Sequence, residues 1–142
     1  MEIKNSKKNI TGIWLTKFEN ANSLREYVEF TYLENEDNPK SKFAQEIGIN
    51  HFDSDFIESI FLKDSLELAK QVTKVSFAEN FISELTEKLS SIDYTNKNSI
   101  ISLTGIKDRN NSVNEKLFNF FPVENTNDKL QFVGLFNYEI NE

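Results

Sequence analysis

Residues 10–18 read ITGIWLTKF and carry large apolar side chains at both even-numbered and odd-numbered positions. Trp14 and Phe18 belong to the even-numbered set, whereas Ile13 and Leu15 belong to the odd-numbered set. Alternate side chains of a strand point to opposite faces of its sheet, and a strand that is apolar on both faces is typical of the sheet interior. The pattern therefore predicts a central strand.

Two short helices are predicted to follow this strand. Ser23 and Glu26 have the spacing of a capping box, in which the two side chains satisfy backbone N–H groups at the start of a helix. A second helix is predicted from Ser41, and Gly48 has the position of its left-handed C-cap. Residues 34–39 between them are rich in Glu, Asp and Asn and contain a Pro, so they are predicted to be a loop.

The rest of the chain predicts one longer helix and several strands. Ser76 and Glu79 repeat the capping-box spacing ahead of an amphipathic stretch that extends to Leu89. Strands are predicted over residues 56–62, 100–106, 117–123 and 130–140, and the last two are predicted to form an antiparallel hairpin. This order predicts an α+β fold with a mostly antiparallel sheet of about five strands and two to four helices packed on one face.

Length and composition predict a single domain over residues 1–142, with residues 1–9 as a candidate flexible basic segment. No apolar run approaches the roughly 20 residues that a membrane-spanning helix needs. The N-terminus is lysine-bearing and lacks the apolar core of a signal peptide, and the chain has no Cys. We therefore expect a cytoplasmic protein with no membrane partner.

The formal net charge of −7 is unevenly distributed along the chain. Residues 1–18 carry +3, residues 19–60 carry −7 and residues 61–142 carry −3. Acidic charge opposes binding to nucleic acid and favours a basic protein partner. The predicted partner-binding residues combine acids with two aromatic anchors, and they are Glu34, Glu36, Asp37, Asp53, Asp55, Glu58, Tyr32 and Phe52. The alternative is a solvated acidic face that only keeps the protein soluble.

Residue types that support catalysis are sparse. His51 is the single histidine, and the four glycines lack the spacing of a phosphate-binding loop. Asp53 and Asp55 have the spacing that begins a calcium loop, but the glycine and the distal glutamate of such a loop are missing. We therefore predict no enzyme activity, no cofactor and no metal. A hydrolase that uses Asp53, Asp55 or Glu58 with His51 remains an alternative.

Several short motifs follow one another along the chain. They are Ile13-Trp14-Leu15, Leu24-x-x-Tyr27-Val28, Thr31-Tyr32, Ser41-x-Phe43, Ile47-Gly48-Ile49, Asp53-x-Asp55-Phe56, Ser76-Phe77-x-x-x-Phe81 and Phe132-Val133-Gly134. In their order and spacing, from about residue 10 to residue 139, these motifs resemble the immunity protein 22 family of bacterial polymorphic toxin systems.

The resemblance implies a cytosolic antidote that binds the catalytic domain of a cognate toxin, often a nuclease, and neutralises it without chemistry of its own. By position it covers Trp14, Tyr27, Asp53, Asp55 and Phe81, of which Trp14 and Phe81 are expected in the core. The rival interpretation is a non-catalytic interaction or scaffold domain that has no toxin partner.

Overall fold

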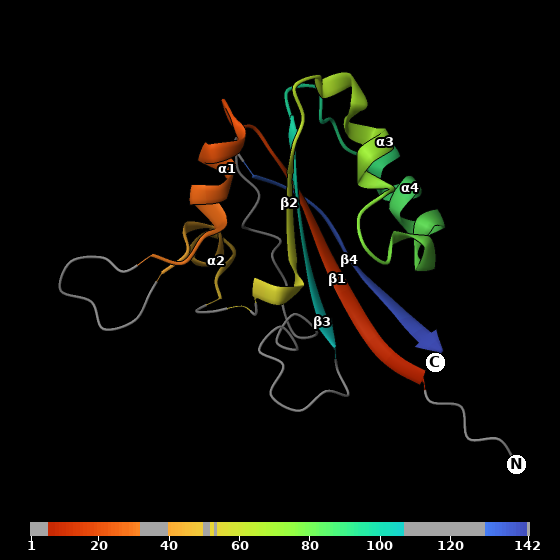
Figure 1. The fold of residues 1–142 in the computed structure, drawn as a ribbon. Helices are drawn as coiled ribbons and strands as arrows, with labels where there is room; N and C mark the ends of the chain where they lie inside the picture. The colour runs from red at the N-terminus through yellow and green to blue at the C-terminus, as the bar shows by residue number, and fades with distance from the viewer. Residues whose placement is uncertain (1–5, 32–39, 50–51, 53, 107–129, 142) are drawn as a thin grey trace, which may run out of the picture.

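The computed structural model describes residues 6–31, 40–49, 52, 54–106 and 130–141. These residues form one antiparallel sheet and four α-helices, which confirms the α+β class (Figure 1). The strands are β1 (Ser6–Thr16), β2 (Ile57–Phe61), β3 (Ser99–Ile106) and β4 (Leu130–Asn141). The helices are α1 (Ala21–Val28), α2 (Lys42–Ile47), α3 (Leu68–Val72) and α4 (Ile82–Ser90), and 3₁₀ turns occupy Ser54–Phe56, Ser65–Glu67 and Ala78–Asn80.

The strand order is β2-β3-β1-β4, so β1 has a partner on each side, as the apolar stretch at residues 10–18 predicted. It pairs antiparallel with β3 along Asn9–Thr16 and with β4 along Ser6–Thr16. The β1–β4 register shifts between Ile13 and Trp14, where β4 carries one extra residue. Such a bulge increases the local twist of the sheet.

The helices cover both faces of the sheet, which corrects the prediction that they pack on one face. Figure 1 shows α1 and α2 on one side and α3 and α4 on the other. The reason lies in β1 itself, because a strand with apolar side chains in both alternating sets leaves two apolar faces to be buried. Helices on a single face would expose one of these sets to water.

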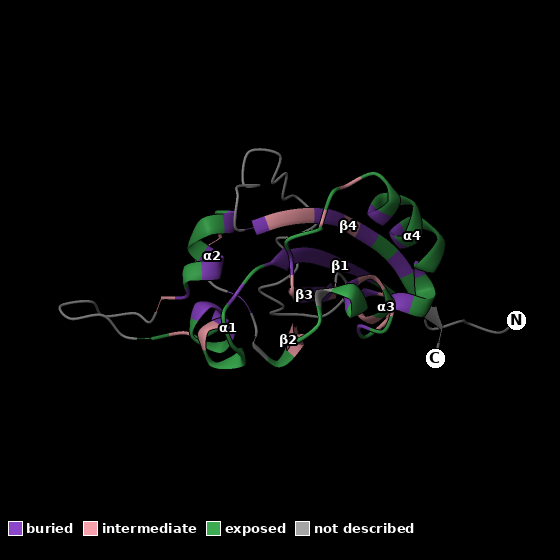
Figure 2. Cartoon of the chain, turned by 90° about the horizontal axis from the view of Figure 1, so that it is seen from above, coloured by how far each residue is buried: buried purple, intermediate pink, exposed green. Residues whose placement is uncertain are grey.

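Two hydrophobic clusters result, one on each side of the sheet. Trp14 belongs to the α1/α2 side, where its ring centroid lies 5.0 Å from that of Phe43 and 5.7 Å from that of Phe132. On the α3/α4 side the rings of Phe81 and Phe136 stack with centroids 4.8 Å apart. Figure 2 shows buried residues on the sheet and on the helix sides that meet it.

The described part of the sheet has four strands instead of the predicted five. The predicted strand over residues 117–123, and with it the predicted hairpin, lies outside the described residues. The described partner of β4 is β1. The predictions over residues 56–62, 100–106 and 130–140 correspond to β2, β3 and β4.

The two capping-box predictions are wrong, whereas the α2 caps are confirmed. Helix α1 begins after Asn20, whose side chain accepts from the backbone N–H of Ser23, so the helix starts earlier than the motif implied. Helix α4 follows Phe81 and has no side-chain cap, because a 3₁₀ turn at Ala78–Asn80 separates it from the predicted start. The same spacing of Ser and Glu occurs in many non-helical segments. In α1 the capping side chain is that of Asn20 and not that of Ser23.

Gly48 ends α2 in the left-handed region, with φ of 85°. Its backbone N–H donates to the carbonyl groups of Ala44 and Gln45, which closes the last turn. We expect Gly48→Ala to lower the free energy of unfolding by about 1 kcal/mol, because a Cβ atom is strained at positive φ. Urea unfolding measures this loss. Gln45→Ala, an exposed change on the same helix, is the control and should shift stability by less than about 0.5 kcal/mol.

Candidate protein-interaction surface

The predicted partner-binding residues divide into two groups. Tyr32, Glu34, Glu36, Asp37 and Asp53 lie outside the described residues. Phe52, Asp55 and Glu58 are described, and the structure gives each of them a different environment. The described part of the candidate site therefore consists of these three residues and of Thr31 and Lys40, which flank residues 32–39 in the sequence.

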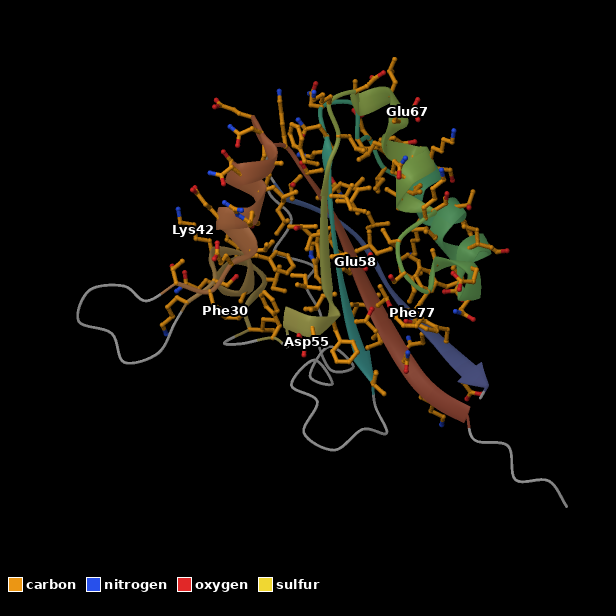
Figure 3. All side chains as sticks on the ribbon, in the orientation of Figure 1. Phe30, Lys42, Asp55, Glu58, Glu67 and Phe77 are labelled. Atoms are coloured by element: carbon orange, nitrogen blue, oxygen red, sulfur yellow. The ribbon has the colours of Figure 1, made fainter. Side chains whose placement is uncertain are left out.

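Asp55 is exposed at the surface. It lies in the 3₁₀ turn Ser54–Phe56, directly ahead of β2, and Figure 3 shows it at the end of the sheet where β2 begins. A turn at the end of a strand holds a side chain on a fixed scaffold while leaving it accessible to a partner. Asp55 therefore has the position expected of a contact residue.

Glu58 lies along β2 on the α3/α4 side of the sheet (Figure 3). It pairs with Ser102, which in turn pairs with Ile13 of the α3/α4 cluster. Its carboxylate accepts a hydrogen bond of 2.8 Å from the backbone N–H of Ser76. Glu58 therefore anchors the segment ahead of α4, and the structure does not bring it together with Asp55 in one cluster.

Phe52 is buried, with 1 % of its surface exposed. Its ring centroid lies 4.6 Å from that of Phe30 and 6.0 Å from that of Phe43. The residue belongs to the α1/α2 cluster. The prediction of Phe52 as a surface anchor is therefore wrong. A large apolar side chain is buried where it can be, even when its neighbours in sequence are polar or acidic.

Residues 32–39, which include Glu34, Glu36 and Asp37, are flanked in the sequence by a hydrogen-bonded pair. The backbone N–H of Thr31 donates to the carbonyl of Lys40 at 2.9 Å, and the N–H of Lys40 donates back to Thr31 at 2.7 Å. This isolated antiparallel bridge joins the chain on either side of residues 32–39. The segment that contains Glu34, Glu36 and Asp37 therefore leaves and rejoins the described structure at two residues that are hydrogen-bonded to each other.

Helices α1 and α2, which flank this loop in sequence, are joined by a polar contact that sequence reasoning missed. The hydroxyl of Tyr27 donates to the carboxylate of Glu46. Glu46 lies on α2, and no spacing rule connects it to a residue 19 positions earlier. The contact joins the two helices that lie on either side of residues 32–39 in the sequence.

A family model described as Immunity protein 22 matches residues 11–139. The chain belongs to the immunity protein 22 family. No curated protein and no solved structure gives a match to the chain. The matched range begins within β1 and ends within β4, so it includes every described helix and the strands β2 and β3. Membership in an immunity-protein family implies a toxin partner.

The metal and hydrolase alternatives can be compared with the described residues of this immunity protein 22 member. Among the described residues there is no group of three or more His, Cys, Asp or Glu side chains that could hold a metal ion. Two surface hollows, of about 550 and 460 Å³, lie beside α1 and beside α4. Neither hollow is lined by Asp55 or Glu58, while His51 and Asp53 of the hydrolase alternative lie outside the described residues.

No helix in the described ranges is long and apolar enough to cross a membrane.

Burial raises the pKa of Tyr27 far above its ordinary value of 10.0, and the hydrogen bond to Glu46 and the negative charge of Glu46 add to this. Above pH 10 the unfolded chain loses this proton while the folded chain keeps it, so stability falls as pH rises. We expect Tyr27→Phe to lose less stability than the wild type between about pH 9 and pH 11. Urea unfolding at both pH values measures the difference. Buried Tyr138 also has a raised pKa, and it is present in both proteins, so it contributes the same loss of stability to each. An equal total loss in the two proteins would therefore show that Tyr27 does not contribute.

Proposed function

We propose that this immunity protein neutralises a cognate bacterial toxin by binding the toxin's catalytic domain in a stoichiometric complex, without chemistry of its own. The family match over residues 11–139 carries the proposal. The proposed location is the cytoplasm, where a toxin delivered into a cell would meet its antidote.

The proposed contact surface is the acidic segment from Glu34 to Glu58. A nuclease toxin holds nucleic acid with Lys and Arg side chains, and carboxylates can occupy the places where phosphates would bind. Exposed Asp55 and the fixed ends of the loop at Thr31 and Lys40 support this surface. The toxin class in the proposal is therefore a nuclease-type domain with a basic cleft.

The structure changes the proposed role of two residues, Glu58 and Phe52, and the other proposals stand as the sequence made them. Glu34, Glu36, Asp37, Asp53 and Asp55 are the proposed contact acids, and Tyr32 is the proposed aromatic anchor. Glu58 contributes negative charge to the electrostatic field of the proposed surface, while its carboxylate accepts a hydrogen bond from the backbone N–H of Ser76. Phe52 supports the surface from within the core.

Co-expression tests the proposal directly. The reading frame adjacent to this gene is taken as the candidate toxin and is produced from an inducible promoter, with and without the immunity protein. Growth should arrest with the toxin alone and recover when both are present, and the two chains should co-purify in equal amounts.

A destabilised variant with the same surface, Gly48→Ala, is the control for expression level and should still protect. Continued growth arrest in the presence of folded wild-type protein contradicts the proposal. That result favours the scaffold interpretation, in which the chain has a partner that is not a toxin.

A further inference from the structure

Strand β2 forms one edge of the sheet. In the order β2-β3-β1-β4 it pairs with β3 on one side, and no other strand of the described residues pairs with it. Figures 1 and 2 show β2 at the rim of the sheet, with α1 on one face and α3 on the other. An edge strand offers a row of backbone N–H and C=O groups to any second strand that can lie beside it.

Strand β2 is short and carries one charge, Glu58, but it lacks the other features that usually protect such an edge. Its sequence, IESIF, contains neither Pro nor Lys, and its register with β3 runs without a bulge from Ile57 to Phe61. Ile57, Ile60 and Phe61 are each half-buried, so they keep apolar surface in contact with water. The one charged side chain, Glu58, is held by the Ser76 amide. The edge is regular and apolar, which favours strand pairing.

The sequence around this edge is complementary to itself. Residues 55–63 read DFIESIFLK, with Ser59 at the middle. An antiparallel copy centred on Ser59 places Ile57 opposite Phe61, a pairing of β-branched and aromatic side chains that stabilises sheets. The same register places exposed Asp55 near exposed Lys63 of the second copy, twice in each dimer.

We propose that two copies of this chain pair along β2 in antiparallel orientation, with the two-fold axis at Ser59, so that the four described strands of each copy join in one continuous sheet. The strand pairs of this register run from Ile57 to Phe61, and the attraction between Asp55, in the turn just ahead of β2, and Lys63, just after it, favours this register. The register also favours a second copy over an extended segment of another protein, since both halves of the match are present in this chain. The proposal rests on the sequence of β2 and on its place at the edge of the sheet, and it shares one contact residue, Asp55, with the proposed toxin-binding surface.

Cysteine cross-linking tests the two-fold axis. The chain has no Cys, so S59C introduces a single thiol at an exposed position. Paired residues of antiparallel strands have Cα atoms about 4.5–5.5 Å apart, which is within the range of a disulfide. Mild oxidation should convert most of the S59C protein to a disulfide-linked dimer. The matched control S83C places the thiol at an exposed position on α4 and should remain largely uncross-linked under the same conditions.

Charge reversal provides a second test that does not depend on cysteine. Sedimentation or light scattering over a concentration series gives the dimer dissociation constant of the wild type. Each of Asp55→Lys and Lys63→Asp should weaken the dimer by about tenfold or more, because two attractions become two repulsions. The double variant Asp55→Lys/Lys63→Asp should return to within about threefold of the wild type, because each pair is again of opposite charge.

The two tests have distinct contrary outcomes. Equal cross-linking of S59C and S83C, or a wild type that stays monomeric at every concentration, overturns the proposal. A double variant as weak as the single variants also overturns this register. The last contrary outcome is a monomer whose S59C thiol reacts with a thiol reagent unless another protein is bound. That result would show that β2 pairs with the other protein and not with a second copy.

Discussion

Replacing Trp14 by alanine is expected to lower the free energy of unfolding by about 3–5 kcal/mol. Trp14 is fully buried on the central strand, and its ring packs against Phe43 of α2 and Phe132 of β4. The substitution therefore leaves a large cavity between the sheet and the helices that support the acidic loop. Gly12 cannot close the cavity, because it has no side chain and lies directly beside the ring.

Urea unfolding followed by circular dichroism measures this loss. Leu66→Ala is the control, since Leu66 is 89 % exposed and its truncation should change stability by less than about 0.5 kcal/mol. Trp14→Phe should cost much less than Trp14→Ala, because it keeps an aromatic ring and removes an indole N–H that has no hydrogen-bond partner within the described structure. A loss below about 1 kcal/mol for Trp14→Ala would contradict the central role of this residue.

The second large effect concerns the rate at which the toxin is bound. Changing the proposed contact acids to their amides, as Glu34→Gln, Glu36→Gln, Asp37→Asn, Asp53→Asn and Asp55→Asn, should slow association by about 10- to 100-fold at low salt. The dependence of the association rate on ionic strength should flatten in parallel, because screening has less charge to act on. Surface plasmon resonance with immobilised toxin measures both quantities.

A matched variant separates local charge from total charge. Five exposed acids outside the proposed surface are changed to Gln, and they are Glu19, Glu67, Glu84, Glu87 and Glu139. This variant loses the same five negative charges and should keep most of its association rate. Equal slowing of the two variants would show that net charge, and not the segment from Glu34 to Asp55, attracts the toxin.

The sequence predicted the sheet well because the relevant signals are local and strong. Apolar residues in both alternating sets placed β1 at the centre, and Gly48 marked the end of α2 because few other residues adopt positive φ. The prediction of helices on one face went wrong because it relied on the order of elements. The two apolar sets of β1, read together, already required two covered faces.

The proposed site was less predictable, because exposure depends on contacts between distant parts of the chain. Phe52 lies between two acidic or polar neighbours in sequence, yet it packs on Phe30 and Phe43. Glu58 looked like part of an acidic cluster, but the Ser76 amide lies against it from 18 positions away. The hydrophobic periodicity of a sequence indicates which face of a strand a residue occupies. The contacts that cover that face come from distant parts of the chain and are seen only in the folded structure.

The most direct test of the central claim is a titration of purified toxin with this immunity protein, with toxin activity as the readout. Stoichiometric binding predicts that activity falls linearly and reaches its minimum at one equivalent of immunity protein, and that it returns when the complex is dissociated and the toxin is recovered. Undiminished activity at a large excess would contradict the account. So would progressive, permanent loss of activity at far less than one equivalent, which is the behaviour of an enzyme and not of a binding protein.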